Sequence, residues 1–142
     1  MLTQILIGIL LTLATIVIAS LGWWALESLI RRVHRWSLRP PHGPKLMAIL
    51  VMALTWNILI IVAAVLVWAL AYMVFGIFTT FEAAVYFSLV AFTTLGFGDI
   101  LLPTEWRLLG GMAAANGLLL FGLITAILVE TLRDTRQRQR RD

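Results

Sequence analysis

Seven consecutive residues combine hydroxyl groups, flexible backbone and an acid inside a chain that is otherwise strongly apolar. They read TTLGFGD and are Thr93, Thr94, Leu95, Gly96, Phe97, Gly98 and Asp99. Because Gly96 and Gly98 alternate with bulkier residues, every second position can adopt a positive φ without steric cost. The carbonyl oxygens of consecutive residues can then point in the same direction. A dehydrated cation could take the place of the hydrogen bonds that such oxygens would otherwise lack.

The composition places this segment in a membrane protein. Of the 142 residues, 61% are hydrophobic and only 13% are charged, values outside the range of ordinary soluble domains. No polar stretch is long enough to bury a soluble core, so the length indicates one membrane-embedded domain. The chain has no cysteine, which excludes disulfides, thiolate metal sites and thiol nucleophiles.

The net charge of +4 comes from basic residues that are grouped. Ten of the eleven lie in two blocks, and only Arg107 stands apart; the ten are Arg31, Arg32, Arg35, Arg39, Lys45, Arg133, Arg136, Arg138, Arg140 and Arg141. Short basic blocks beside apolar spans follow the positive-inside rule, which places both blocks in the cytoplasm and argues against nucleic acid as a partner. The arginines of the second block could contact anionic lipid head groups.

Three apolar stretches are long enough to cross a bilayer. The first is residues 2–26, the second begins at residue 46 and ends near residues 72–75 with Gly76 as its stop, and the third is residues 108–132. Basic residues follow the first stretch rather than precede it, which argues against a cleavable signal peptide. We therefore expect an N-terminal transmembrane helix in residues 1–30, a basic cytoplasmic linker in 31–45 and a basic cytoplasmic tail in 133–142.

The segment between the second and third stretches enters the membrane but is too short to cross it. Residues 79–92 are apolar, and about 13 helical residues reach roughly 20 Å, two thirds of the hydrocarbon thickness. Thr79 and Glu82 have the spacing of a capping box at the start of this helix. The chain must return as non-helical backbone, which is tolerated at that depth only inside protein or along an aqueous path. Residues 93–99 are this return, and several copies must converge to complete a cation cage.

TTLGFGD resembles the selectivity-filter signature of potassium channels, with Leu95 and Phe97 where Val and Tyr are usual. Both replacements resemble variants found in two-pore-domain and ether-à-go-go-type channels, and neither removes a backbone carbonyl. The resemblance covers about half of the chain: an outer helix, a pore helix at residues 79–92, the filter at 93–99 and an inner helix at 108–132. It implies a potassium-channel pore domain in residues 46–132. The first helix is a departure, because the minimal two-helix pore lacks it.

The resemblance also implies roles for individual residues. K⁺ would bind the filter segment, through the backbone carbonyls of Thr94, Leu95, Gly96 and Phe97, with Gly98 completing the ion-binding segment. Filter support is implied for Thr93, Asp99 and Tyr86. Gly117 matches the glycine at which the inner helix often bends. Positions that face the central cavity are matched by Leu118, Phe121 and Thr125. No catalytic residue, enzymatic activity or cofactor is expected, since K⁺ is the transported ion.

Two polar residues, Asp99 and Asn116, need hydrogen-bond partners. In many potassium channels an aromatic donor on the pore helix holds the filter acid, and the matching residue is Tyr86. A glutamate fills this role in other members, but Val90 stands at that position here. We therefore predict a hydrogen bond from the Tyr86 hydroxyl to Asp99; the alternative is an ordinary interfacial tyrosine.

Asn116 lies in the third span. Its side chain has two alternative roles, an interhelical hydrogen bond or contact with ions.

These observations predict an all-α membrane protein with three transmembrane helices, a re-entrant pore helix and a filter loop, assembled as a homotetramer. The expected function is passive, selective K⁺ conduction across the plasma (inner) membrane. A weakly selective cation channel and a non-conducting membrane scaffold are alternatives. A potassium transporter subunit fits less well, because such proteins carry four unlike repeats in one long chain and this chain has one.

The charge distribution predicts the orientation of the chain. A reporter fused after Asp142 should report a cytoplasmic location, and one fused at Met1 an external location. Enzymatic reporters that are active on only one side of the membrane measure this. Finding both ends on the same side would remove one of the three spans.

Overall fold

The computed structural model describes residues 1–37 and 42–139, which fold into helices joined by short connections. The elements, in order, are α1 (Leu2–Ser37), α2 (His42–Val74), α3 (Phe81–Phe92), the short 3₁₀ helix η1 (Thr104–Trp106) and α4 (Arg107–Gln139). No strand occurs among the described residues. The expected all-α fold class is therefore confirmed.

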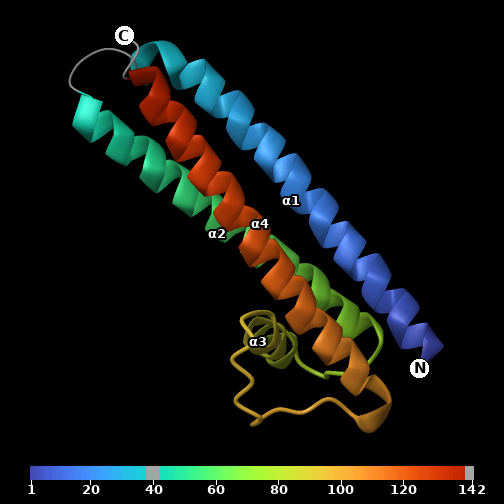
Figure 1. Ribbon diagram of the computed structural model, residues 1–142. Helices are drawn as coiled ribbons and strands as arrows, with labels where there is room; N and C mark the ends of the chain where they lie inside the picture. Colours follow the sequence, from blue (N-terminus) through green and yellow to red (C-terminus); the bar gives the residue numbers. More distant parts are fainter. Residues whose placement is uncertain (38–41, 140–142) are drawn as a thin grey trace.

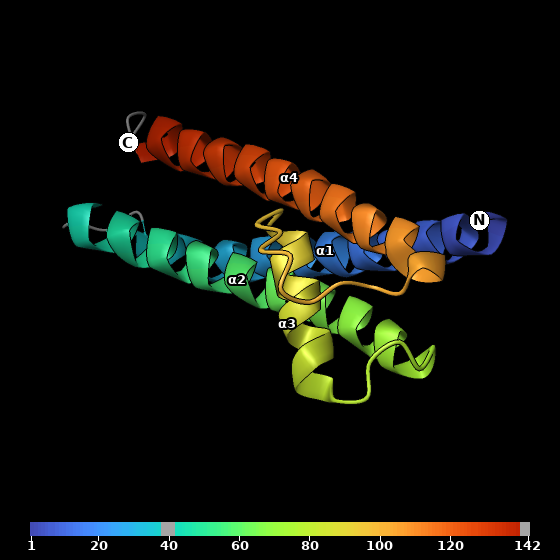
Figure 2. The same ribbon diagram turned by 90° about the horizontal axis from the view of Figure 1, so that it is seen from below.

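Three long helices form a bundle, and the short α3 lies across one half of it. In Figure 1, α1, α2 and α4 run alongside one another, with the amino end of α1 and the carboxyl end of α4 at opposite ends of the bundle. Figure 2 shows α3 reaching toward the bundle and the following segment leading back to the start of α4. Within the described part of the chain, three segments are long and apolar enough to span a membrane: Leu2–Leu29, Met47–Val74 and Thr104–Glu130. The chain is an integral membrane protein with an additional N-terminal span.

The connection between the first two spans differs from the expected linker at residues 31–45. Helix α1 continues through Ser37, and α2 already begins at His42. Arginine is a good helix former, so the basic residues prolong α1 beyond its apolar part instead of ending it. Pro44 lies in the first turn of α2, where a missing N–H breaks no intrahelical hydrogen bond. Pro40 and Pro41 lie outside the described residues.

The last helix is also longer than expected at both ends. The sequence predicted an inner helix at residues 108–132 and a separate tail at 133–142, whereas α4 spans Arg107–Gln139 and follows η1 directly. The residues after 132 are mostly arginine and glutamine, which favour helix, and they include no glycine or proline. Nothing in this stretch stops the helix, so most of the predicted tail is helical.

The end of α2 is built as the sequence predicted, with Gly76 at φ +66°. The Gly76 N–H donates to the Met73 carbonyl (3.0 Å), and the Ile77 N–H donates to the Tyr72 carbonyl (2.9 Å). This pair of hydrogen bonds is a Schellman motif, which requires a left-handed residue and therefore favours glycine. The chain is thereby turned out of α2 toward α3.

The start of α3 lies one residue later than the predicted capping box. Thr80, not Thr79, is the N-cap, and its hydroxyl accepts the Ala83 N–H at 3.3 Å. Both threonines precede the same apolar helix, and the three-residue spacing to Glu82 wrongly indicated Thr79 as the N-cap. Glu82 lies in the first turn, where its negative charge is favourable beside the open N–H groups.

Aromatic side chains fasten α3 to α2. Trp68 and Tyr72 are fully buried one helical turn apart on α2. The Tyr72 ring packs edge-on against Phe78 at 5.9 Å and against Phe87 of α3 at 5.5 Å between ring centroids. Edge-to-face pairs of this kind add to the apolar area they bury. The re-entrant helix therefore has a fixed position against the second span.

Helix α1 packs on the bundle from Gly8 to Gly22. Gly8, Thr15 and Gly22 recur every seven residues along it. A Cβ on Gly8 would overlap the Met112 sulfur of α4, and one on Gly22 would lie 2.8 Å from Ile60 Cδ1 of α2. Small residues allow such close backbone approach between membrane helices. At this contact the indole Nε1 of Trp56 also donates to the Gly22 carbonyl at 2.8 Å.

This last contact predicts a stability effect. Trp56→Phe removes the indole donor while keeping an aromatic ring, so it should lower the stability of the folded protein by about 0.5 to 1.5 kcal/mol. Thermal unfolding of purified protein in detergent measures the change. Ser20→Ala is the control, because the Ser20 hydroxyl is exposed and donates within α1, to Ile16. Equal unfolding temperatures for Trp56→Phe and the control would contradict the assignment.

Candidate functional site

The backbone of the segment after α3 alternates in the sign of φ. Thr94, Gly96 and Gly98 have φ values of 57°, 56° and 77°, whereas the intervening Leu95 and Phe97 are not in the positive-φ region. A residue with positive φ reverses the rotation introduced by a neighbour with negative φ. Successive peptide groups can therefore keep their N–H groups on one edge and their carbonyls on the other. The sequence predicted the two glycines in this role but not Thr94.

Thr94 is held in an unfavourable conformation by the hydrogen bonds around it. A β-branched residue with positive φ is rare, and such a conformation costs about 1 to 3 kcal/mol. The Thr94 N–H donates to the Ala91 carbonyl at 2.9 Å, and the Leu95 N–H donates to the Val90 carbonyl at 3.0 Å. These carbonyls lie in the last turn of α3, where a helix would otherwise leave them open. The start of the segment is thus tied to the end of the helix.

Thr93 closes α3 as its C-cap residue. Its N–H donates to the Leu89 carbonyl at 3.0 Å, and its hydroxyl donates to the same carbonyl at 2.8 Å. The hydroxyl also lies 3.3 Å from the Val90 carbonyl. Thr93 therefore satisfies helix carbonyls directly before the alternating segment begins.

At the far end of the segment, Asp99 is bound by the middle of α3. The Tyr86 hydroxyl donates to Asp99 Oδ2 at 2.5 Å, and the Ile100 N–H donates to Asp99 Oδ1 at 3.0 Å. The hydrogen bond from Tyr86 lowers the pKa of the Asp99 carboxyl below its usual value, and the same bond raises the pKa of Tyr86. Both shifts favour a charged acid and a neutral phenol at neutral pH. The hydrogen bond predicted between these residues is present.

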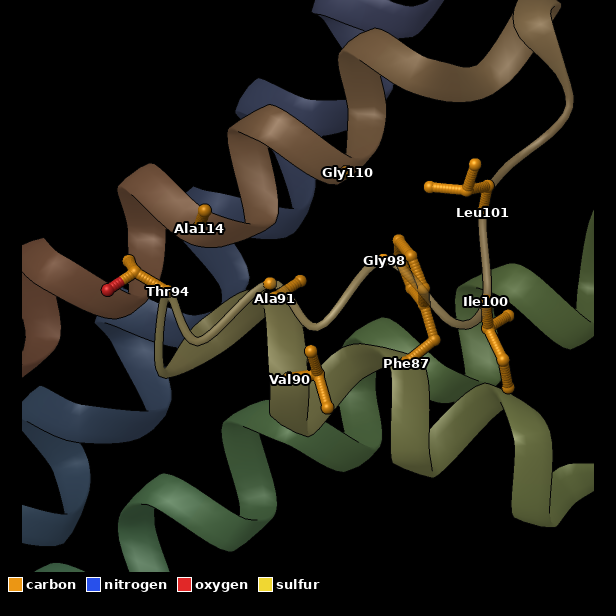
Figure 3. A pocket seen from close by; sticks show the side chains of 10 residues that line it. Phe87, Val90, Ala91, Thr94, Gly98, Ile100, Leu101, Gly110 and Ala114 are labelled. Atoms are coloured by element: carbon orange, nitrogen blue, oxygen red, sulfur yellow. The ribbon is translucent and has the colours of Figure 1, made fainter.

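A groove lies between α3, the alternating segment and the start of α4 (Figure 3). Its cavity volume is about 310 Å³, and it is lined mainly by apolar groups of Phe87, Val90, Ala91, Thr94, Gly96, Gly98, Ile100, Leu101, Gly110 and Ala114. Beside it, Leu95 and Phe97 are 59% and 65% exposed. A single chain therefore leaves the large side chains of this segment without cover.

Gly117 makes a contact that the sequence analysis missed. The residue is buried, and a Cβ on it would overlap the carbonyl oxygen of Phe92 and lie 2.9 Å from Phe92 Cα. Phe92 is the last residue of α3, so α4 passes directly behind the end of the short helix. The glycine in the sequence was interpreted as a hinge; the contact gives a packing reason for it, and the hinge role stays a prediction.

The remaining predicted residues of α4 lie on two different faces. Leu118, Phe121 and Thr125 are exposed and follow at helical spacing, and the Thr125 hydroxyl donates to the Phe121 carbonyl at 2.8 Å. Asn116 is buried instead, and its Nδ2 donates to the hydroxyl of Thr15 on α1 at 2.7 Å. The interhelical role of Asn116 is therefore observed. The first three residues have little cover within the chain, and the cavity-lining role expected for them stays a prediction.

The fold and this site define a membrane protein with a re-entrant pore loop between its last two spans. A family model described as an ion channel matches residues 57–134, which include the second half of α2, all of α3, the segment after it and most of α4. The match covers more than half of the chain, which therefore belongs to this family of two-helix ion-channel pore domains. Searches of curated proteins and of solved structures returned no match.

The Tyr86–Asp99 bond predicts a change in acid sensitivity. Asp99 has a lowered pKa, so its charge and the bond persist until the pH falls through that lowered value. Tyr86→Phe keeps the ring but removes the donor, so the pKa of Asp99 should return toward its ordinary value and protonation should occur at a higher pH. We expect the variant to assemble, to lose sustained ion flux and to be inhibited at a higher external pH.

Ion flux into liposomes, measured as a function of external pH, tests this expectation. A variant with the sustained flux and the pH profile of the parent protein would show that the bond does not support the segment.

Proposed function

We propose that the chain forms a homotetrameric, passive K⁺-selective channel in the plasma (inner) membrane, with its amino end outside and its carboxyl end in the cytoplasm. The ion sites are formed by the backbone carbonyls of Thr94, Leu95, Gly96 and Phe97, with the Thr94 hydroxyl at the innermost site. Residues 93–99 are then the selectivity filter. Arginines at the cytoplasmic end contact anionic lipid head groups in this arrangement.

The observation that carries the proposal is the alternating backbone of the filter. Positive φ at Thr94, Gly96 and Gly98 is the pattern that lets carbonyls share one edge, and it occurs at the end of a helix that enters the membrane without crossing it. A dehydrated cation is the partner that a row of carbonyl oxygens lacks in this setting. The carboxyl end of α3 adds its negative dipole end beside the same region.

One chain carries a single filter, so the ion cage needs further copies around an axis. The exposed Leu95 and Phe97 support this step, because burial against neighbouring copies would cover them. The exposed face of α4 with Leu118, Phe121 and Thr125 would then line the central cavity, and Gly117 would allow the inner helix to bend at the level of the filter.

Two alternatives differ in measurable ways. A weakly selective cation channel would share the architecture but pass Na⁺ nearly as well as K⁺. A non-conducting scaffold would assemble without passing ions. Fluxes of K⁺ and Na⁺ into liposomes that contain purified protein separate all three, and K⁺ uptake well above Na⁺ uptake supports the proposal.

The filter assignment predicts a glycine substitution that acts on selectivity. Gly96→Ala places a Cβ on a residue at φ +56°, at a cost of about 1 kcal/mol or more in every subunit. K⁺ flux should fail or lose its preference over Na⁺. Gly111→Ala is the matched control, because a Cβ there meets no atom within 4 Å. Unchanged K⁺ selectivity in Gly96→Ala would refute the filter assignment.

The stoichiometry is a separate prediction. Four chains should surround one pore, so chemical crosslinking and the mass of the detergent-solubilised protein should both indicate a tetramer. A stable dimer as the conducting unit would contradict it, since two filters cannot close a ring of carbonyls around one ion.

A further inference from the structure

A buried hydrogen-bonded pair joins the additional helix α1 to α4 inside the membrane-spanning region. Thr15 of α1 is 0% exposed and Asn116 of α4 is 1% exposed. Asn116 Nδ2 donates to Thr15 Oγ1 at 2.7 Å, and Thr15 Oγ1 lies 3.1 Å from Asn116 Oδ1. Both residues lie in segments long and apolar enough to cross the bilayer.

The pair has one hydroxyl proton for two acceptors. The Thr15 hydroxyl lies 2.8 Å from the Thr12 carbonyl of its own helix as well as 3.1 Å from Asn116 Oδ1. A threonine hydroxyl donates once and accepts from the Asn116 amide at the same time. Because neither water nor lipid can replace these partners inside the bundle, the pair favours one rotation of α4 relative to α1.

Asn116 precedes the glycine that touches the end of α3. Neighbouring residues of a helix point about 100° apart, so Asn116 can face α1 while Gly117 faces Phe92. A Cβ on Gly117 would overlap the Phe92 carbonyl oxygen, which shows how closely the two helices approach. Phe92 leads directly into Thr93 and Thr94. The rotation of α4 that Thr15 favours therefore determines whether Gly117 faces Phe92, the residue directly before Thr93 and Thr94.

Further contacts on either side of Thr15 pack α1 against α4 and α2. One turn before Asn116, the Met112 side chain fills the space left by Gly8 of α1. Toward the other end of α1, Gly22 packs on Ile60 and accepts a hydrogen bond from Trp56 of α2. Helix α1 is thus fixed to both helices of the pore domain.

We propose that Thr15 and Asn116 are positioning residues for the filter, through which α1 holds α4 against the carboxyl end of α3. The role of α1 is then to keep Gly117 in contact with Phe92 while ions pass through the filter. This inference rests on the proposed function as a channel. It assigns to α1 a part in sustained conduction, in addition to its part in the stability of the bundle.

The test separates positioning from stability with an apolar pair of the same shape. In the double variant Thr15→Val, Asn116→Leu, both polar partners are removed together, so no buried group is left unsatisfied and the stability should remain near that of the parent. The directional preference is lost, however, and α4 can rotate. We expect an intact oligomer with parent-like thermal stability, but with sustained K⁺ flux into liposomes reduced roughly three- to tenfold, the range expected for one interhelical hydrogen bond.

Two further variants serve as matched controls. Thr15→Ser keeps the hydroxyl and should retain the flux of the parent. Trp56→Phe removes a hydrogen bond between α1 and α2 that does not involve α4, so it should lower thermal stability without a matching loss of flux.

Several outcomes would overturn the proposal that Thr15 and Asn116 position the filter. Parent-like flux in the double variant, loss of flux in Thr15→Ser, or an equal loss in Trp56→Phe overturns the proposal. Failure of the double variant to assemble would make the pair a stability element only, which also overturns it. If the parent protein passes no K⁺, the proposed channel function fails and this inference fails with it; a conducting parent with parent-like variants refutes the inference alone.

Discussion

The structure depends on one constraint: backbone polar groups at membrane depth need partners. The three long helices meet it within themselves, since each residue bonds to the preceding turn. Helix α3 ends before it has crossed, so the chain must return without a helical ladder. The first N–H groups of the return bond to the last carbonyls of α3, through Thr94 and Leu95. No backbone hydrogen bond from the described residues reaches the carbonyls of residues 94–98, and this deficit is the chemical basis of the cation site proposed above.

The return segment is clamped at both ends by the helix that precedes it. At its start, Thr93 and Thr94 use the final turn of α3, and these hydrogen bonds offset the strain of a threonine at positive φ. At its end, Asp99 is bound by Tyr86, two turns back along the same helix. The aromatic packing of Tyr72 on Phe87 fixes α3 itself to α2. The conformation of seven residues is therefore set by a helix of only 12 and by what packs on it.

The sequence predicted those features that have a local chemical cause. Gly76 ends α2 because its turn needs positive φ, and Gly96 and Gly98 mark the alternating backbone for the same reason. Tyr86 and Asp99 were paired through a resemblance, not through any local pattern. Helix ends in the basic regions were missed, because arginine continues a helix as readily as it marks the membrane boundary. Thr94 could not be foreseen, since β-branched residues avoid the conformation that its neighbours impose on it.

Contacts between distant segments were the least accessible to sequence analysis, and α4 shows why. Asn116 offered two interpretations and Gly117 suggested a hinge, but neither residue carries information about which helix lies opposite it. Once α1 and α3 are in place, the 100° step between successive residues of a helix explains why the two residues have different partners. Asn116 meets Thr15 of α1, and Gly117 meets the Phe92 carbonyl of α3. A glycine at position 117 allows α4 to lie this close to α3, while Asn116 on the neighbouring face of α4 bonds to α1. The additional helix thus contacts the two-helix pore domain at the level of Phe92, directly before residues 93–99.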